Sequence, residues 1–255
     1  MSFAIHIAFD GLSGVDGSAR FSFGPTAALA SVSGPIAARP ATEHPVRATI
    51  DVHVRPLSSV PGTTEKHAGS ALKGILERAC ILAHHPRTLI QVVVQALSPS
   101  SPRSAGVWRA SSSRSADGDE GGDALLAAEI NACSLALINA GSIPMRGVVC
   151  AIAVAQSTSA SRPQFVMDGG GSGNTECIGC FAFLFGVDQT ATESAGGPIP
   201  PSKMIWTNYR ASPGNAFSVT ALAEAEKVAL EGATVVWTKM KESLRASSFA
   251  GDGMS

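Results

Sequence analysis

The feature that most constrains the fold is a change in the spacing of apolar residues, which occurs more than once along the chain. Residues 46–54 alternate between apolar and polar side chains, as in a strand with one buried face. Residues 68–82 carry apolar side chains at steps of three and four, the period of a helix, and residues 88–97 have the β-branched composition of a strand. Mixed helices and strands without a regular strand–helix–strand alternation predict an α+β fold in two or more layers.

The beginning of the chain predicts a small antiparallel sheet. Residues 3–9 alternate like residues 46–54. Between them, turn-forming pairs at Asp16-Gly17, Gly24-Pro25 and Gly34-Pro35 indicate a hairpin or meander.

The second half predicts another set of helices and strands. A helix with one apolar stripe ends at Gly141, where glycine favours a left-handed stop. A buried strand follows over residues 147–155, and two further strands flank the sequence GGGSGN, which we interpret as a hairpin loop. Another strand near residues 203–208 precedes a last helix that we expect to pack across the sheet. The stripe of the first helix consists of Leu126, Ile130, Cys133 and Leu137, and that of the last of Leu222, Ala229, Ala233, Val236 and Met240.

One stretch between these halves cannot build a core. Residues 98–123 are rich in Ser, Gly, Pro and charged side chains, which predicts a disordered surface insertion. Loops are expected at 169–174 and 188–202. Because no change in composition marks a linker, we predict a single domain over residues 1–246 with a tail at 247–255.

The composition limits the classes of function. The formal charge is −1, so the 255-residue chain lacks the positive field of a free-standing nucleic-acid-binding protein. Five cysteines, an odd number, and the lack of a recognisable secretory leader predict a reducing compartment. Apolar runs are interrupted by Gly, Ser or Asn, so we expect no membrane-spanning segment.

Short motifs that resemble metal or cofactor sites do not meet the requirements of such sites. Cys177 and Cys180 begin an apolar strand without a second pair of ligands nearby, which favours structural cysteines. The GGGSGN sequence lacks the Lys-Ser/Thr of a phosphate loop. His84 and His85 are best explained as part of a helix-to-strand connection. We therefore expect no metal and no cofactor.

Four segments together resemble the RNase PH family. They are DGSARFSFGPTAALASVSGP, VPGTTEKHAGSALKGILERA, HPRTLIQVVVQ and INACSLALINAGSIPMRGVVCAIAV, in the same order as in the family and from about Asp16 to the last helix. The resemblance is greatest to subunits of the exosome ring. It implies a ribosomal-protein-S5-domain-2-like fold and a ring of six RNase PH-type subunits, topped by S1/KH cap proteins, through which single-stranded RNA is threaded.

Active members of this family cleave RNA with inorganic phosphate, which paired arginines must hold while carboxylates bind a metal or transfer a proton. In active members Gly-Gly-Thr-Arg opens the helix before the Pro-Met-Arg-Gly corner, whereas this chain has Leu126 or a neighbour at the arginine position. A second arginine position falls near Glu65-Lys66, and no convincing pair of aspartates is found where Asp168 is followed by GGGSGN and Glu176. The resemblance therefore implies a ring subunit without catalytic residues.

Other residues acquire roles through the same resemblance. Arg55, Lys66 and Lys73 lie on or beside the family's substrate-facing loop and helix, so they are candidate RNA-binding residues, with plain solvation as the alternative. Arg146, in the corner after the helix that ends at Gly141, is expected to be structural, capping carbonyls or pairing with an acid.

Two alternatives stay open. An active phosphate-dependent 3′–5′ exoribonuclease could use a neighbouring subunit or the arginines of the insertion, Arg103, Arg109 and Arg114. A ring-independent RNA-binding module is disfavoured by the charge and by the few aromatic residues. A scaffold for RNA processing and degradation, rRNA included, is expected in the nucleus, with its nucleolus, and in the cytoplasm.

Overall fold

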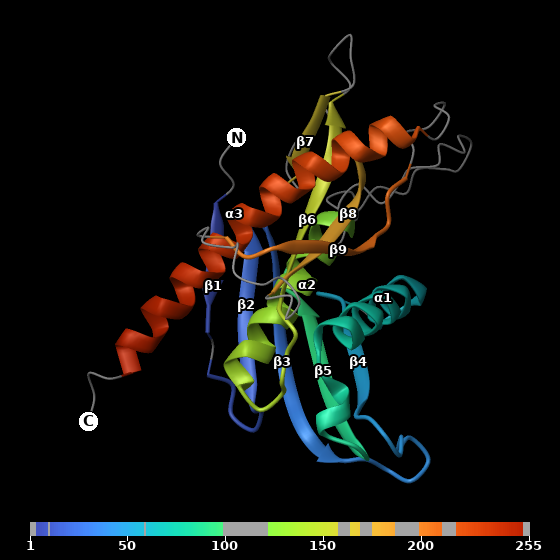
Figure 1. The fold of residues 1–255 in the computed structure, drawn as a ribbon, viewed down its shortest axis with the longest axis vertical. Helices are drawn as coiled ribbons and strands as arrows, with labels where there is room; N and C mark the ends of the chain where they lie inside the picture. The colour runs from blue at the N-terminus through green and yellow to red at the C-terminus, as the bar shows by residue number, and fades with distance from the viewer. Residues whose placement is uncertain are drawn as a thin grey trace.

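A computed structural model describes residues 4–9, 11–58, 60–98, 122–157, 164–168, 175–186, 199–210 and 218–251. Its helices and strands are mixed along the chain without regular alternation, which agrees with the predicted α+β class (Figure 1). They are β1 (Ile5–Ala8), β2 (Gly17–Phe23), β3 (Thr26–Ala37), β4 (Thr49–Arg55), α1 (Thr63–Ala79), a short 3₁₀ helix η1 (Leu82–His84), β5 (Thr88–Ala96), α2 (Gly122–Ala140), β6 (Val148–Ser157), β7 (Gln164–Asp168), β8 (Thr175–Phe185), β9 (Ser202–Thr207) and α3 (Val219–Gly251).

The first sheet is larger than the sequence predicts. Its five strands have the order β1-β2-β3-β5-β4, and β4 is parallel to β5. A parallel pair needs a crossover connection, which α1 provides between β4 and β5. The prediction of a small antiparallel sheet is therefore wrong for β4, which joins β5 rather than the opening strands.

The hairpin of β2 and β3 is confirmed, with its turn at Gly24-Pro25. Gly34-Pro35, however, is not a turn, because β3 continues through it to Ala37. The pairing of β3 with β5 shifts between Ser33 and Ile36, so these two residues form an irregularity within a long strand.

The second sheet corrects another prediction. Its order is β7-β6-β8-β9, and both β7 and β8 pair with β6. The strands on either side of GGGSGN are thus separated by β6 and do not form a hairpin with each other. The loop itself, residues 169–174, lies outside the described residues.

Helix α2 lies between the two sheets and forms the centre of the core (Figure 1). It contacts β2 and β3 of the first sheet and β6 and β8 of the second. Every residue from Asp123 to Leu137 is buried, so the predicted one-sided stripe understates its burial. The helix is long and apolar enough to cross a membrane, but 83% of that window is buried inside the protein. Gly141, with φ of +64°, ends it as predicted.

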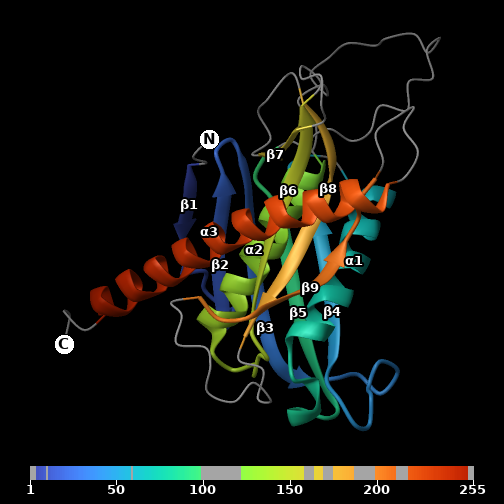
Figure 2. The same ribbon diagram turned by 45° about the horizontal axis from the view of Figure 1, so that its top comes forward.

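The other two helices cover different faces. Helix α1 packs on β4, on the same face of the first sheet as α2, and it ends at Ala79, earlier than the apolar spacing to Leu82 indicates. Helix α3 packs across β6, β7 and β8 on the outer face of the second sheet, as expected (Figure 2). Its buried residues include Ala225, Ala229 and Met240, and it continues to Gly251, into the predicted tail.

Residues 99–121 of the predicted insertion lie outside the described residues. Both ends of the predicted range belong to the ordered fold. Ser98 is buried and its hydroxyl accepts a hydrogen bond from the Ala27 N–H at 3.1 Å, while Asp123 is buried in the first turn of α2. Of the predicted loop at 188–202, residues 199–201 are described, and β9 begins at Ser202.

Candidate nucleic-acid interface

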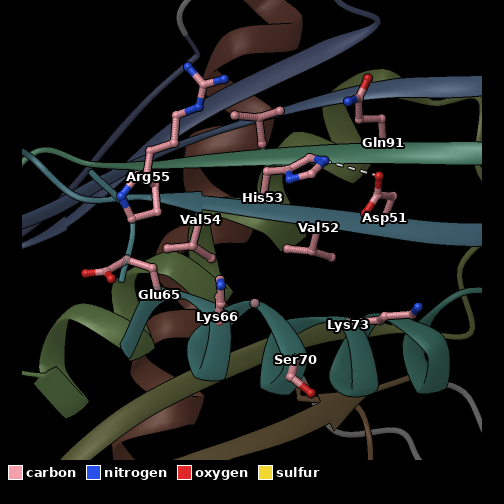
Figure 3. Close-up of a pocket in the computed structure, with 13 residues that line it drawn as sticks. Asp51, Val52, His53, Val54, Arg55, Glu65, Lys66, Ser70, Lys73 and Gln91 are labelled. Carbon is pink, nitrogen blue, oxygen red and sulfur yellow. Dashed lines mark hydrogen bonds and ion pairs between the residues drawn. The ribbon is translucent and has the colours of Figure 1, made fainter. Parts of the chain in front are cut away.

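A groove of about 610 Å³ follows strand β4, with α1 on one side and the outward face of β4 and β5 on the other (Figure 3). It contains all the predicted RNA-binding residues, because β4 and α1 are consecutive elements that pack together. Its lining comprises Asp51, Val52, His53, Val54, Arg55, Pro61, Glu65, Lys66, Gly69, Ser70, Lys73, Gln91 and Val93.

The cations of the groove are spread along it. Lys66 and Lys73 are both exposed and stand seven residues apart on α1, a separation of about 10 Å along one side of the helix. Ser70 lies between them, also exposed. Arg55 ends β4 and extends to the other side of the strand, whereas Lys66 points from α1 toward β4 (Figure 3). The arrangement provides separate points of positive charge.

Two acidic residues of the groove have partners. The Asp51 carboxylate lies 3.1 Å from His53 Nε2 on the exposed face of β4. Glu65 accepts a hydrogen bond from the Gly62 N–H at 2.6 Å and so binds one of the unpaired donors at the start of α1. Counting Arg55, Lys66 and Lys73 against Asp51 and Glu65, the groove has a net charge of 3 − 2 = +1 with a neutral His53.

This chemistry suits an extended polyanion. Separate exposed cations can each contact one phosphate of a chain, which a compact ligand could not match. No Phe, Tyr or Trp side chain is among the described residues that line the groove, so it offers no large aromatic platform on which bases could stack. Contacts of this kind would follow the phosphate backbone regardless of base sequence.

Helix α2 buries an acidic residue that the sequence reasoning missed. Glu129 is only 3% exposed. Burial, with the charge of Glu65 as a smaller cause, raises the pKa of the Glu129 carboxyl to about 8. The sequence contains one signal that could have revealed this buried carboxyl: Glu129 is an acidic residue within the largely apolar sequence of this helix.

The family resemblance aligns the phosphate-binding arginines with Leu126 or a neighbour and with a position near Glu65-Lys66. Leu126 is 8% exposed and belongs to the hydrophobic core, and Glu65 carries negative charge. Lys66, beside Glu65, faces the β4 groove.

A second polar cluster, also missed, joins the start of α2 to the end of β9. The buried Asp123 carboxylate accepts a hydrogen bond from Asn208 Nδ2 at 2.6 Å and forms an ion pair with Arg210. Asn208 also accepts a hydrogen bond from the Cys180 N–H at 2.5 Å. These bonds compensate for burial of the Asp123 charge and fix β9 against α2 and β8.

The corner that contains Arg146 is held by its main chain. Arg146 N–H donates to the Ala79 carbonyl at 2.7 Å, Ile81 N–H donates to the Pro144 carbonyl at 2.8 Å, and Met145 forms an isolated bridge with Cys80. The Arg146 residue is exposed, and its guanidinium has no hydrogen bond or ion pair within the described part of the chain. The corner thus connects the end of α1 to the start of β6.

The remaining motifs show no cluster suited to a metal. Within the described ranges no three His, Cys, Asp or Glu side chains come together in this way. Burial raises the pKa of the Cys80 thiol to about 12 and also raises the pKa of the Cys133 and Cys150 thiols, so these thiols stay protonated near neutral pH. Cys180 is buried, whereas the Cys177 side chain lies outside the described residues.

Asp168 and Glu176, the acidic residues on either side of GGGSGN, lie on different strands. Asp168 of β7 is opposite Ala153, and Glu176 of β8 is opposite Gln156, so β6 separates them. Strands two apart in a sheet are separated by about 9 to 10 Å. Their side chains, like Arg103, Arg109 and Arg114 of the insertion, lie outside the described residues.

The fold consists of a buried helix, α2, between two sheets, with α3 packed on the outer face of the second sheet. This arrangement defines an RNase PH-type α+β domain. The model of the 3′ exoribonuclease family, domain 1 (RNase_PH), matches residues 4–142, more than half of the chain. The chain therefore belongs to this family, and the resemblance seen in its motifs is confirmed at that level.

Curated relatives include the exosome complex component rrp46 of Schizosaccharomyces pombe, 37% identical over 141 residues, which are 55% of this chain and 53% of that protein. The exosome complex exonuclease RRP46 homolog of Oryza sativa subsp. japonica is 34% identical over 136 residues, 53% of this chain and 48% of that protein. The matched segments thus span about half the length of these relatives. From the motifs we predict the subunit called exosome component five, whereas these relatives carry the name RRP46.

A solved structure supports the fold. The crystal structure of rice Rrp46 has a TM-score of 0.64 with this chain, at 21% sequence identity, and covers 94% of both chains.

Proposed function

We propose that this chain is a non-phosphorolytic RNase PH-type ring subunit of an RNA exosome, which assembles with other ring subunits and guides single-stranded RNA for 3′–5′ processing and degradation. The names of its relatives support an exosome component, and membership of the family supports the ring architecture.

We infer the absence of phosphorolysis from the side chains at the two positions where the family's phosphate-binding arginines are expected. By the family resemblance the two arginine positions fall at Leu126 or a neighbour and near Glu65-Lys66, where Leu126 belongs to the core and Glu65 is a carboxylate. Phosphate carries negative charge, so Glu65 would repel it. The sequence also offers no convincing pair of aspartates where Asp168 is followed by GGGSGN and Glu176.

The β4 groove supports the guiding role. Arg55, Lys66 and Lys73 supply exposed charges at intervals along it, which suits a phosphate backbone that must slide rather than stay bound. Because the net charge of the chain is −1, it has no strong positive field of its own to hold RNA. The contacts in the groove therefore add to those of neighbouring subunits and of cap proteins of the S1/KH type. We place this work in the nucleus, with its nucleolus, and in the cytoplasm.

A second candidate function is favoured by one observation: the rice and Arabidopsis relatives are named exonucleases. An active phosphate-dependent 3′–5′ exoribonuclease would then need arginines from a neighbour or from the insertion.

Incubation with single-stranded RNA separates the two functions. The full chain, alone and together with RNase PH-type partner subunits, is supplied with RNA, with and without inorganic phosphate and magnesium, and nucleoside diphosphates are measured. We expect no release by the chain alone and RNA retention in the assembly. Phosphate-dependent release of nucleoside diphosphates by the chain alone would establish the second function instead.

A further inference from the structure

The β4 groove has two walls that differ in charge. The wall formed by α1 carries Lys66 and Lys73 against the carboxylate of Glu65, so its net charge is 2 − 1 = +1. The other wall is the outward face of β4 and β5, where Arg55 and Asp51 have opposite charges, so its net charge is 1 − 1 = 0. As long as its histidine is neutral, this second wall does not attract phosphate.

That histidine, His53, lies between the two charged residues of the second wall. Alternate residues of a strand point to the same face, so His53 shares the outward face of β4 with Asp51 and Arg55 (Figure 3). On β5, Val93 is opposite His53 and Gln91 is opposite Asp51, and neither side chain is charged. The charged groups that face His53 therefore come from its own strand and, across the groove, from α1.

The imidazole of His53 is held on one side and open on the other. Its Nε2 lies 3.1 Å from the Asp51 carboxylate, and 53% of the side chain is exposed. An ionised carboxylate only accepts hydrogen bonds, so Nε2 carries the proton of this contact. Nδ1 has no hydrogen-bond partner within the described part of the chain, and it becomes a second donor when the ring is protonated.

Protonation of this ring changes the charge of the second wall. Histidine is the side chain that ordinarily gains or loses its charge between about pH 5 and 8. A protonated His53 raises the net charge of its wall from 0 to +1 and adds a donor beside the Arg55 guanidinium. A phosphate in the groove favours the imidazolium by its own charge, so phosphate binding and proton uptake strengthen each other.

We propose that His53 is a further phosphate-contacting residue of the β4 groove, which binds single-stranded RNA as the imidazolium, with Asp51 as the residue that positions the ring. RNA binding in the groove is therefore coupled to the uptake of a proton at His53. This inference rests on the proposed RNA-guiding function, and it adds a contact that depends on pH to those of Arg55, Lys66 and Lys73.

The test measures RNA affinity against salt concentration, at about pH 5.5 and about pH 8, for the full chain assembled with its RNase PH-type partner subunits. At the lower pH the slope of log affinity against log salt should be steeper for the parent than for His53→Gln by about 0.7, because one more phosphate is neutralised. At the higher pH the two slopes should be equal. His53→Lys, a permanent cation, should have the steeper slope at both pH values. His84→Gln, which changes an exposed histidine outside the groove, should behave like the parent.

Three other outcomes overturn the proposal. Equal slopes for the parent and His53→Gln at the lower pH would show that the ring contacts no phosphate, and an equal loss in His84→Gln would show a general effect of charge. Binding by His53→Phe that matches the parent at the lower pH would mean that the ring stacks on a base instead.

A further variant separates failure of this inference from failure of the proposed function. If Lys66→Gln/Lys73→Gln lowers the slope and His53→Gln does not, RNA follows the groove without a contact to His53. If the parent assembly binds no RNA at either pH, the guiding function fails together with this inference. Melting temperatures at both pH values show that the variants are folded, as expected for substitutions of an exposed side chain.

Discussion

Asn131 of α2 and Ala151 of β6 form a double hydrogen bond in the centre of the protein. Asn131 Nδ2 donates to the Ala151 carbonyl at 2.9 Å, and the Ala151 N–H donates to Asn131 Oδ1 at 2.7 Å. Among the described residues, the pairing of β7 with β6 begins at Ala153, two residues after Ala151. The Asn131 side chain thus occupies both main-chain groups of Ala151 and attaches the central helix to the second sheet.

Asn131→Leu should be strongly destabilising. The substitution removes both partners of two buried main-chain groups, and each group left without a partner costs about 1 to 3 kcal/mol. We expect the free energy of unfolding to fall by about 2 to 5 kcal/mol, measured by urea denaturation. Asn139→Leu, which removes a single part-buried bond to the Ser18 carbonyl, is the matched control and should cost less. Equal losses in the two variants would contradict the role of the double bond.

Glu129→Gln should stabilise the protein in a manner that depends on pH. The pKa of the Glu129 carboxyl is about 8 in the folded state and about 4.5 in the reference state, so the folded protein retains a proton that the unfolded chain has lost. The associated stability is fully present below pH 4.5 and is lost as the pH rises to about 8. Glutamine is neutral throughout, so its advantage should grow over that window, to on the order of 5 kcal/mol, and then level off.

Melting curves between pH 5 and pH 9 measure this difference. The matched control is Glu224→Gln, an exposed carboxyl on α3, for which we expect a small change without the same rise. A constant difference between Glu129→Gln and the parent protein at all pH values would contradict the raised pKa.

Lys66→Gln/Lys73→Gln should weaken RNA binding by the assembled ring and reduce its dependence on salt. Each phosphate contact that is lost lowers the slope of log affinity against log salt by about 0.7 for a single strand, so the pair should lower it by about 1.4. Filter binding of oligonucleotides with different sequences should show a uniform loss, because contacts to phosphates carry no base-sequence information. Lys203→Gln/Lys227→Gln removes two exposed lysines elsewhere and should leave the slope unchanged. An equal effect of both pairs would indicate general electrostatics rather than a specific path.

Much of the fold follows from sequence patterns that act over short distances. The β2–β3 hairpin and the end of α2 at Gly141 depend on turn residues and on a left-handed glycine, which act locally. The order β7-β6-β8 depends instead on which strands meet across the core, and no local pattern distinguishes that order from a hairpin around residues 169–174. Burial of α2 on all sides likewise results from its place between two sheets.

The residues of the candidate site also differ in how far the sequence could predict them. The family resemblance indicates Arg55, Lys66 and Lys73, and these line one groove because β4 and α1 are neighbours in sequence. Gln91 and Val93, in contrast, reach the groove only through the parallel pairing of β4 with β5. Contacts between α2 and the end of β9, such as Asp123 with Arg210, join residues far apart in the chain, so periodicity alone could not reveal them.

Arg146 and Gly147 should respond to substitution in opposite ways. The Arg146 side chain is exposed and its corner is held through the main chain, so Arg146→Ala should change the free energy of unfolding by less than about 0.5 kcal/mol. At Gly147 an added Cβ would lie 2.3 Å from the Phe185 carbonyl oxygen and 2.9 Å from Gly186 Cα. Both contacts are with main chain and cannot be relieved by rotation of a side chain, so Gly147→Ala should cost about 2 kcal/mol or more. Urea denaturation of the two variants measures both effects. A large loss in Arg146→Ala would show that the guanidinium itself, rather than the close approach of β6 to the end of β8, holds this corner together.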